Sequence, residues 1–246
     1  MYYAISDLHG YSKEGFLKML SSAGFSDGDF LFVLGDVIDR GDESIGLLQW
    51  IMNSPNVQML IGNHEAMLLA CDFLFSKIDK NFIDGLTLDK LELFQKWKDN
   101  GGGQTVSQML KLLPEERTEI VEFLRDCPYY VGVTVGDKDF VLTHAGLGGY
   151  SPEKKIKDYS FEELIWNRPY LEDGYSTEFI TVFGHTPTAY YGREFKGKVI
   201  MTDTWINIDT GASGGLSPTL LRLDDLMTFS FDENGEIISC LAYKNV

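Results

Sequence analysis

The sequence predicts an α/β fold built on parallel strands, and three observations support this prediction. Within the first 65 residues, a strand-like apolar segment is followed by a loop and a helical pattern three times over. Such an alternation is typical of parallel strands joined by crossover helices. The second segment, Leu31–Leu34, is a continuous apolar run, as expected of a strand buried on both faces. Beyond Pro128 the pattern changes to short strands, which predicts a region richer in β-structure.

Local signals set the boundaries of the first elements. Ser12 is expected to N-cap the first helix, and Gly24 lies where the C-cap of that helix would fall. A second helix is predicted over Ser44–Asn53, because Ser54-Pro55 then stops it. The three strands of this region are predicted at Tyr2–Ile5, Phe30–Leu34 and Val57–Ile61.

The segment Ala66–Asp126 is predicted to be mainly helical. Pro114 followed by two glutamates marks the start of one of its helices, and the glycine-rich stretch Asn100–Thr105 is expected to be a loop. No linker, repeat or low-complexity tract interrupts the chain, which predicts a single domain over residues 1–246. The later elements predicted are a hairpin of Tyr129–Val135 with Phe140–Thr143, a short helix that opens with the capping box Ser160–Glu163, and a strand over Phe179–Phe183.

Composition and charge exclude several classes of partner. Hydrophobic residues make up 44 % and charged residues 24 % of the chain, as in a soluble globular enzyme. The net charge of −16 repels nucleic acid and anionic lipid, so neither is expected as a partner. The N-terminal residues lead straight into a strand without room for a signal peptide, and no apolar run is long enough to span a membrane. Three widely spaced cysteines suit a reducing cytoplasm, where the protein is expected.

The four histidines are the most informative feature of the chain. Each follows a predicted strand and lies beside a glycine or in a glycine-bounded loop. A single histidine is usually a surface or core residue, but chance rarely places four of four at strand ends. The same loops carry short acids and an amide. The resulting set of metal-ligand candidates is Asp7, His9, Asp36, Asn63, His64, His144 and His185.

Imidazole, carboxylate and amide ligands without a thiolate suit Mn, Fe or Zn better than Ca or Mg. Six or seven such ligands are too many for one catalytic ion, and suit two ions about 3.5–4 Å apart, as in two-metal phosphoester hydrolysis. One carboxylate should bridge the pair. Arg40 and Arg168 then acquire a role, since guanidinium groups match the non-bridging oxygens of a phosphoryl group. The sequence around Arg168 is also compatible with a helix terminus.

Five motifs in a fixed order resemble those of the calcineurin-like metallophosphoesterases. Within that family they look like the serine/threonine phosphoprotein phosphatases, of the bacterial and phage-lambda type. Asn100–Thr105 and the Gly-His-Thr-Pro sequence that starts at Gly184 also resemble the bacterial branch. The family commonly opens with Gly-Asp-x-His-Gly, and Ser6 replaces the first glycine here, which alters a turn but removes no ligand. The motifs are Asp7–Gly10, Gly35–Gly41, Gly62–Glu65, His144–Gly146 and Gly184–Thr186.

This resemblance implies an architecture and a set of roles. The architecture is a four-layer α/β/β/α sandwich of two mixed β-sheets flanked by helices, with a helical insert after the third strand, at about residues 66–126. The implied roles are metal binding by Asp7, His9, Asp36 (which bridges both metals), Asn63, His144 and His185, general acid catalysis by His64 oriented by Asp39, and phosphate binding by Arg40, Asn63, His64 and Arg168.

The activity implied by the resemblance is hydrolysis of phosphomonoesters, with a serine/threonine or dual-specificity phosphoprotein as the expected substrate. A hydroxide that bridges two divalent metals, of which Mn²⁺ is favoured, would attack phosphorus directly. The partner would be a phosphorylated protein or a small phosphoester. The oligomeric state stays open, and a monomer is compatible with the sequence.

Two alternatives to this activity share features with the sequence. Relatives that hydrolyse diadenosine tetraphosphate symmetrically share most of these motifs, but they typically carry Gly-Asn-His-Asp and lack the second Asp-Arg of the long motif. Glu65 and Asp39–Gly41 therefore favour the protein phosphatase. A non-catalytic metal-binding module is the second alternative. It should have lost a ligand or the acid, and none is missing.

Overall fold

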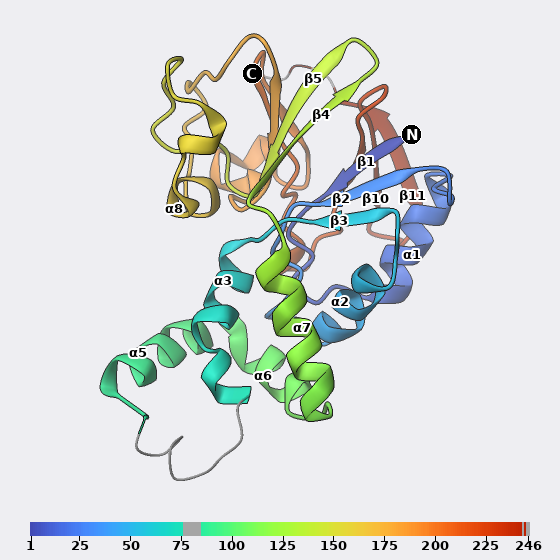
Figure 1. The fold of residues 1–246 in the computed structure, drawn as a ribbon. Coiled ribbons are helices and arrows are strands. Elements are labelled where there is room, and N and C mark those ends of the chain that lie inside the picture. The colour runs from blue at the N-terminus through green and yellow to red at the C-terminus, as the bar shows by residue number, and fades with distance from the viewer. Residues whose placement is uncertain (76–84, 243, 245–246) are drawn as a thin grey trace.

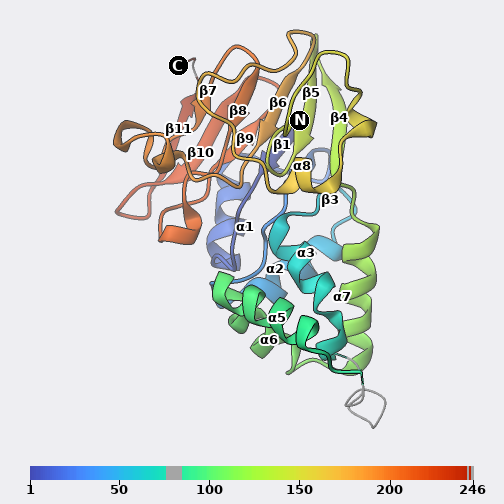
Figure 2. The ribbon, with the colours of Figure 1, turned by 90° about the vertical axis from the view of Figure 1, so that its left-hand side faces the viewer.

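The structure is a computed structural model that describes residues 1–75, 85–242 and 244. Figures 1 and 2 show two β-sheets packed against each other. In the view of Figure 1, most helices lie below the first sheet, and one short helix lies beyond the second sheet.

The first sheet contains the three strands predicted near the N-terminus. Its strands are β1 (Tyr2–Ile5), β2 (Phe30–Val33), β3 (Val57–Met59), β9 (Leu220–Arg222), β10 (Met227–Phe231) and β11 (Ile237–Leu241). They lie in the order β11-β10-β9-β1-β2-β3. β1, β2 and β3 are parallel, which confirms the prediction of crossover connections, and the remaining pairs are antiparallel. The sheet is therefore mixed.

The second sheet begins with the predicted hairpin. Its strands are β4 (Tyr130–Val135), β5 (Lys138–Thr143), β6 (Ile180–Phe183), β7 (Ile200–Met201) and β8 (Trp205–Asn207). They lie in the order β4-β5-β6-β8-β7. β5, β6 and β8 are parallel, while β4 and β7 run antiparallel at the edges. Both sheets thus present the carboxyl ends of parallel strands.

The helices begin and end close to the predicted positions. The side chain of Ser12 accepts the N–H of Gly15 at 3.2 Å, which confirms the predicted N-cap, and the predicted capping box at Ser160–Glu163 is present. Among the described residues, no helix combines the length and apolar character that a membrane span requires. The helices are α1 (Lys13–Ser22), α2 (Ser44–Met52), α3 (Asn63–Ala70), α5 (Leu88–Trp97), α6 (Gly103–Met109), α7 (Pro114–Asp126) and α8 (Phe161–Ile165), with short turns η1 (Asp72–Phe75), η2 (Lys98–Gly102), η3 (Ile156–Asp158), η4 (Thr188–Tyr190), η5 (Arg193–Phe195) and η6 (Ala212–Gly214).

Three clusters of buried hydrophobic side chains lie between the four layers of helices and sheets. Leu31 and Val33 of β2 pack in the cluster that includes residues of α1, α2 and α7. Phe32, between them on the strand, points the other way and packs between the two sheets. Phe183 on the second sheet belongs to a third cluster, with Leu164 of α8 on the outer side. The predicted α/β/β/α sandwich of two mixed sheets is therefore confirmed.

The segment between β3 and β4 is helical where the structure describes it, and residues 76–84 of the predicted helical insert lie outside the described part. The prediction of a loop at Asn100–Thr105 is wrong. This stretch joins α5 to α6 through the π-helical turn η2 and continues as helix. Gly101 alone has a left-handed backbone, with φ of +101°. The helical path is therefore interrupted at Gly101 only, and the residues on either side of it stay helical.

Candidate active site

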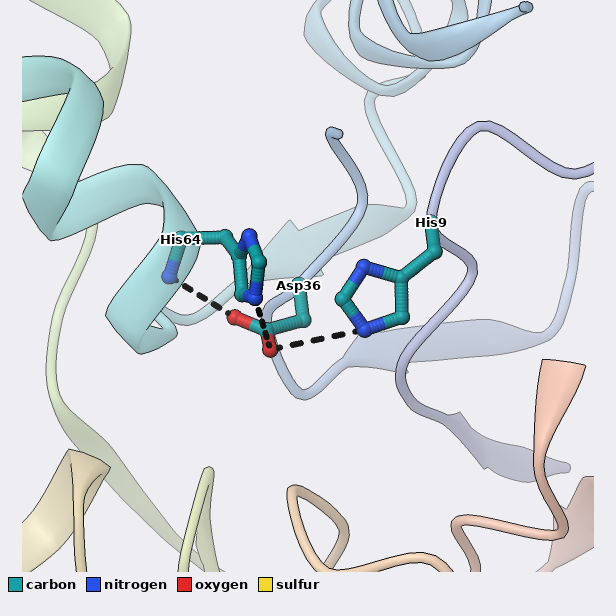
Figure 3. A group of neighbouring side chains, drawn as sticks. All are labelled: His9, Asp36 and His64. Atoms are coloured by element: carbon teal, nitrogen blue, oxygen red, sulfur yellow. Dashed lines mark hydrogen bonds and ion pairs between the residues drawn. The ribbon is translucent and has the colours of Figure 1, made fainter. Parts of the chain in front are cut away.

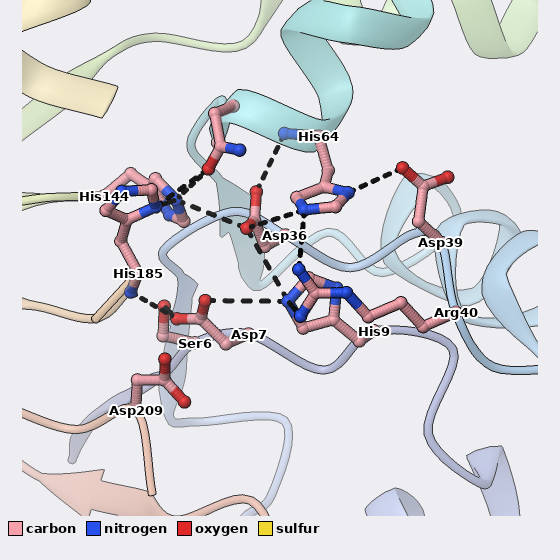
Figure 4. A network of polar contacts seen from close by, with 12 residues as sticks. Ser6, Asp7, His9, Asp36, Asp39, Arg40, His64, His144, His185 and Asp209 are labelled. Carbon is pink, nitrogen blue, oxygen red and sulfur yellow. Dashed lines mark hydrogen bonds and ion pairs between the residues drawn. The ribbon is translucent and has the colours of Figure 1, made fainter. Parts of the chain in front are cut away.

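Loops that follow strands of both sheets converge at one place (Figure 4). The loops after β1, β2 and β3 come from the first sheet, and those after β5, β6 and β8 come from the second. Because neighbouring parallel strands end at the same edge of a sheet, these loops bring together residues far apart in sequence. The side chains labelled in Figure 4 are Ser6, Asp7, His9, Asp36, Asp39, Arg40, His64, His144, His185 and Asp209.

The backbone of this region is strained. Seven non-glycine residues of the described chain have positive φ, a conformation that costs on the order of 1–3 kcal/mol per residue. One of the seven, Leu226, lies outside the site. Strain concentrated at one place indicates that side-chain placement, and not local stability, determines the backbone there. The six strained residues of the site are Asp7, His9, Asp36, Asp39, Arg40 and His185.

Asn63, His144 and His185 bring three ligand-type atoms together. Oδ1 of Asn63 lies 3.0 Å from Nε2 of His144 and 2.9 Å from Nδ1 of His185, and these two nitrogens are 3.2 Å apart. Oδ2 of Asp36 lies 3.5 Å from Nε2 of His144. All four residues are buried, and their donor atoms converge as they would around a cation.

A second group of ligand-type atoms lies on the other side of Asp36. Nε2 of His9 is 3.7 Å from Oδ2 of Asp36 and 3.8 Å from Oδ1 of Asp7. Figure 3 shows that the ring of His64 approaches the same oxygen of Asp36, with its Nε2 at 3.8 Å. Oδ2 of Asp36 thus belongs to both groups, which is the position expected of a bridging carboxylate.

The hydrogen bonds of the histidine ring nitrogens that point away from the site show which ring nitrogens can bind a cation. Nδ1 of His9 lies 3.1 Å from the carbonyl oxygen of Ile38, and Nδ1 of His144 lies 2.8 Å from that of Leu34. A carbonyl oxygen only accepts, so each Nδ1 carries a proton, and Nε2 is the ring nitrogen directed into the site. Nε2 of His185 is buried with no hydrogen-bond partner among the described residues, while its Nδ1 faces the other ligands. These donors fit divalent cations that bind nitrogen and oxygen.

The buried carboxylates of the site favour positive charge on the groups around them. Burial opposes the ionisation of Asp36, but His144 and His64 hold its pKa well below the usual value. Burial also disfavours the charged form of His144, yet Asp36 and Asp7 raise its pKa to about 10. Burial lowers the pKa of His9 to about 3, so that ring is neutral, the form that binds metals. The same effect lowers the pKa of His185 to about 2.

His64 lies in the first turn of α3 and connects the metal-ligand candidates to Asp39. Its Nδ1 is 2.6 Å from Oδ2 of Asp39, and its Nε2 faces the centre of the site. Burial disfavours the protonated ring, but Asp36 and Asp39 outweigh this effect and raise the pKa of His64. Asp39 thus orients the ring, and the surrounding carboxylates favour the protonated form that a proton donor requires.

Arg40 and Arg168 line one cavity of about 180 Å³ beside these groups. Nη1 of Arg40 lies 3.0 Å from Nε2 of His9, and its Nη2 lies 3.2 Å from Nε2 of His64. Arg168 lies beyond the end of α8, and its Nη1 donates to the carbonyl oxygen of His185 at 3.4 Å. Two guanidinium groups at one small cavity are suited to bind one anion.

Four further residues line this cavity that are not among the predicted site residues: Asn100, Trp166, Pro187 and Asp209. Asp209 follows β8 as the other site residues follow their strands, and that position was the available signal. Burial raises the pKa of Asp209 well above its usual value. Asn100 and Trp166 reach the cavity from a helical turn and a helix end, and not from the end of a strand. Asn100 opens the stretch that resembles the bacterial branch of the family.

Ser6 does more than alter a turn. Its Oγ donates to Oδ2 of Asp7 at 2.5 Å, and the backbone N–H of His185 donates to the same oxygen at 2.8 Å. With Oδ2 occupied, Oδ1 of Asp7 is the oxygen that faces His9. A Cβ at Gly184 would lie 2.0 Å from Oδ2 of Asp7, so glycine is required there for this close approach.

Glu65 is fully buried and holds the backbone of two loops of the site. Its Oε1 accepts the N–H groups of Val37 (2.9 Å) and Ile38 (3.3 Å). Its Oε2 accepts those of Asp36 (2.8 Å) and Gly62 (3.0 Å). Burial raises the pKa of Glu65 to about 7, and the N–H donors oppose this rise because they favour the carboxylate. Glu65 therefore positions the turn that presents Asp36.

We expect Glu65→Gln to destabilise the protein by about 2–6 kcal/mol, since its amide NH₂ would face two buried N–H donors, at about 1–3 kcal/mol for each. Urea unfolding measures the change in the free energy of unfolding. The control is Glu163→Gln, because Glu163 accepts the N–H of Ser160 at 2.8 Å at the protein surface. Its expected loss is about 1 kcal/mol or less. Similar losses in both variants would contradict the role of Glu65.

Comparison with known proteins identifies the family. The profile of the calcineurin-like phosphoesterases matches residues 2–208, which contain the two groups of ligand-type side chains. The chain belongs to this family. It is therefore a metallophosphoesterase, a hydrolase whose family implies divalent metal ions at these two groups.

Relatives with two different activities are similar to this calcineurin-like phosphoesterase. A symmetrical bis(5'-nucleosyl)-tetraphosphatase from Chromobacterium violaceum is 37 % identical, with 99 % of this chain and 97 % of the relative covered. Serine/threonine-protein phosphatase 2 from Salmonella typhimurium is 29 % identical, with 87 % and 90 % covered.

Two solved structures share the fold. A structure named as a candidate diadenosine tetraphosphatase has a TM-score of 0.60 and 18 % identity, and covers 98 % of this chain and 93 % of its own. A cold-active protein tyrosine phosphatase has a TM-score of 0.55 and 17 % identity, and covers 97 % and 78 %. At these identities the likeness shows the fold alone.

Proposed function

We propose that residues 1–246 form a single catalytic domain that removes phosphate from serine and threonine residues of proteins. The observation that carries this proposal is the cavity of about 180 Å³, where Arg40, Arg168 and His64 surround one space beside Asp36. Pockets that enclose drug-sized ligands have volumes of about 300–1,000 Å³. A phosphoryl group on a short aliphatic side chain fits this cavity, and the rest of a peptide would lie outside it.

The donor atoms support two divalent cations with Asp36 between them. Mn²⁺ suits this mixture of nitrogen and oxygen ligands, and Fe and Zn suit it as well. When bound, the cations supply Lewis-acid stabilisation of the phosphoryl oxygens and lower the pKa of water. The residues proposed to hold one cation are Asp7, His9 and Asp36, and those proposed to hold the other are Asp36, Asn63, His144 and His185.

The remaining residues act on the substrate. Arg40 and Arg168 bind the non-bridging oxygens, where charge accumulates during phosphoryl transfer. Asn63, which also lines the cavity, is within reach of the same phosphate. His64 donates a proton from Nε2 to the leaving alkoxide, and Asp39 holds the ring in the orientation this requires.

Symmetric hydrolysis of dinucleoside tetraphosphates is the second candidate function. It is favoured by the relative from Chromobacterium violaceum, which has the higher identity and matches over nearly the whole chain. The site supports the phosphatase through two features that such tetraphosphatases typically lack: the glutamate at Glu65, and Asp39 followed by Arg40. Both features make contacts in this structure. Glu65 binds four backbone N–H groups, and Asp39 contacts His64.

A substrate panel tests the proposal. Peptides with phosphoserine, phosphothreonine or phosphotyrosine are compared with diadenosine tetraphosphate and an aryl phosphate, in Mn²⁺ and in a chelator. We expect kcat/KM for the phosphoserine or phosphothreonine peptide to exceed that for the dinucleotide by at least about 10-fold, and turnover to require Mn²⁺. The reverse preference would establish the tetraphosphatase. Two bound metals without turnover of any substrate would indicate a non-catalytic module.

A further inference from the structure

Trp97 and Thr105 have no role in the chemistry above, yet both contact the site. Trp97 is the last residue of α5, and Thr105 lies in the first turn of α6. Both side chains are fully buried. Between them lies the glycine run that was predicted to be a loop. This part of the helical segment packs against the turn that contains Asp39 and Arg40.

Three side chains surround the carboxylate of Asp39. Nε1 of Trp97 donates to Oδ2 at 2.7 Å, and Oγ1 of Thr105 donates to Oδ1 at 2.6 Å. Nδ1 of His64 lies 2.6 Å from Oδ2. The backbone N–H of Asp39 also donates to Oγ1 of Thr105, at 2.9 Å. Because Asp39 is 0 % exposed, water does not compete for these bonds, and both carboxylate oxygens are fixed.

The glycine run permits this arrangement. A Cβ at Gly102 would lie 2.5 Å from Nε1 of Trp97, so only glycine leaves room for the indole. The carbonyl oxygen of Gly101 accepts the N–H of Arg40 at 3.1 Å, and a Cβ at Gly101 would lie 2.7 Å from Cγ of Arg40. The kink between α5 and α6 is therefore shaped to contact the Asp39–Arg40 turn.

We propose that Trp97 and Thr105, with Gly102, are positioning residues that align the general acid through Asp39. If either donor is removed, the carboxylate gains freedom to rotate, and the ring of His64 loses the partner that directs Nε2 toward the leaving oxygen. This inference rests on the proposed role of His64. General acid catalysis contributes about 10²–10⁴-fold, so a misaligned acid forfeits part of that factor.

The test compares a substrate that needs the acid with one that does not. The leaving group of a phosphoserine peptide is the serine alkoxide, which must be protonated. The leaving group of p-nitrophenyl phosphate is a phenolate that is stable without a proton. For W97F and T105V we expect kcat on the peptide to fall about 10-fold with little change in KM, and kcat on p-nitrophenyl phosphate to fall less than about 2-fold. G102A keeps both donors but crowds the indole, and should act in the same direction. Bound Mn²⁺ should stay at the wild-type level.

Trp205→Phe is the matched control. Trp205 is also fully buried, and its Nε1 donates to the carbonyl oxygen of Asp173 at 2.7 Å, which is not a partner of Asp39 or His64. W205F removes a buried indole hydrogen bond of the same length and should leave the ratio of the two activities unchanged. Equal losses on both substrates in W97F and T105V, or loss of Mn²⁺, would overturn the proposal. If W97F does not fold, T105V decides, since it exchanges a hydroxyl for a methyl group of similar size and removes the two bonds between Oγ1 and Asp39.

H64N separates the failure of this inference from the failure of the proposed acid. If H64N slows both substrates equally, the general-acid role of His64 is wrong, and this inference falls with it. The other outcome is that H64N slows hydrolysis of the peptide selectively while W97F, T105V and G102A do not. In that case His64 is still the general acid, and only the positioning role is refuted.

Discussion

Replacement of Asp36 by asparagine is expected to empty both metal positions and abolish turnover. Oδ2 of Asp36 lies 3.5–3.8 Å from ring nitrogens of His9, His64 and His144, so both groups of ligands share this oxygen. The amide also removes a negative charge from a buried site. Loss of an outer-shell partner of a metal ligand costs about 10–100-fold in affinity, so loss of the shared ligand should cost more than about 100-fold.

Metal analysis after gel filtration and calorimetric titration with Mn²⁺ measure this effect. Asp39→Asn is the comparison, since Asp39 is equally buried but its carboxylate contacts His64, Trp97 and Thr105. It should keep both metals and lose rate. Equal metal loss in the two variants would show that the division between a bridging ligand and an orienting carboxylate is wrong.

His64→Asn is expected to slow hydrolysis of a phosphoserine peptide by about 10²–10⁴-fold, the range that general acid catalysis contributes. Hydrolysis of p-nitrophenyl phosphate should fall by about 10-fold or less, because its leaving group needs no proton. The change also removes the contact with Asp39, but it preserves the backbone N–H that donates to Oδ1 of Asp36 at 3.0 Å. The ratio of kcat values for the two substrates is the measurement.

The same variant tests a second role that the geometry suggests for His64. Its Nε2 belongs to the group that also contains His9 and Asp36, so His64 is a geometric candidate for a metal ligand. A metal ligand and a proton donor give different outcomes. Two bound Mn²⁺ ions per chain in the variant support the proton donor, whereas loss of one ion together with equal rate losses on both substrates would assign His64 to the metal.

The boundaries of the strands and helices could be predicted from the sequence, because neighbouring residues set them. Apolar runs and capping residues lie within a few positions of the boundaries they set, as at Ser12 and Ser160. The four histidines could be connected to one site because each follows a strand and strand ends meet at a sheet edge. The loop prediction at Asn100–Thr105 failed for the opposite reason. Glycine favours a loop locally, but the kinked helix there is stabilised by contacts with Trp97 and Arg40.

The α/β class and the family thus follow from the sequence alone, because motifs and strand periodicity are properties of neighbouring residues. The candidate ligand residues were also proposed from these motifs. Which atoms meet depends on the tertiary structure. The N–H of His185 reaches Asp7 across 178 positions of the chain, and Trp97 reaches Asp39 across 58. Such bonds depend on how distant loops pack, and no short-range pattern records them. The shared oxygen of Asp36, the fixed carboxylate of Asp39 and the buried Asp209 all follow from that packing.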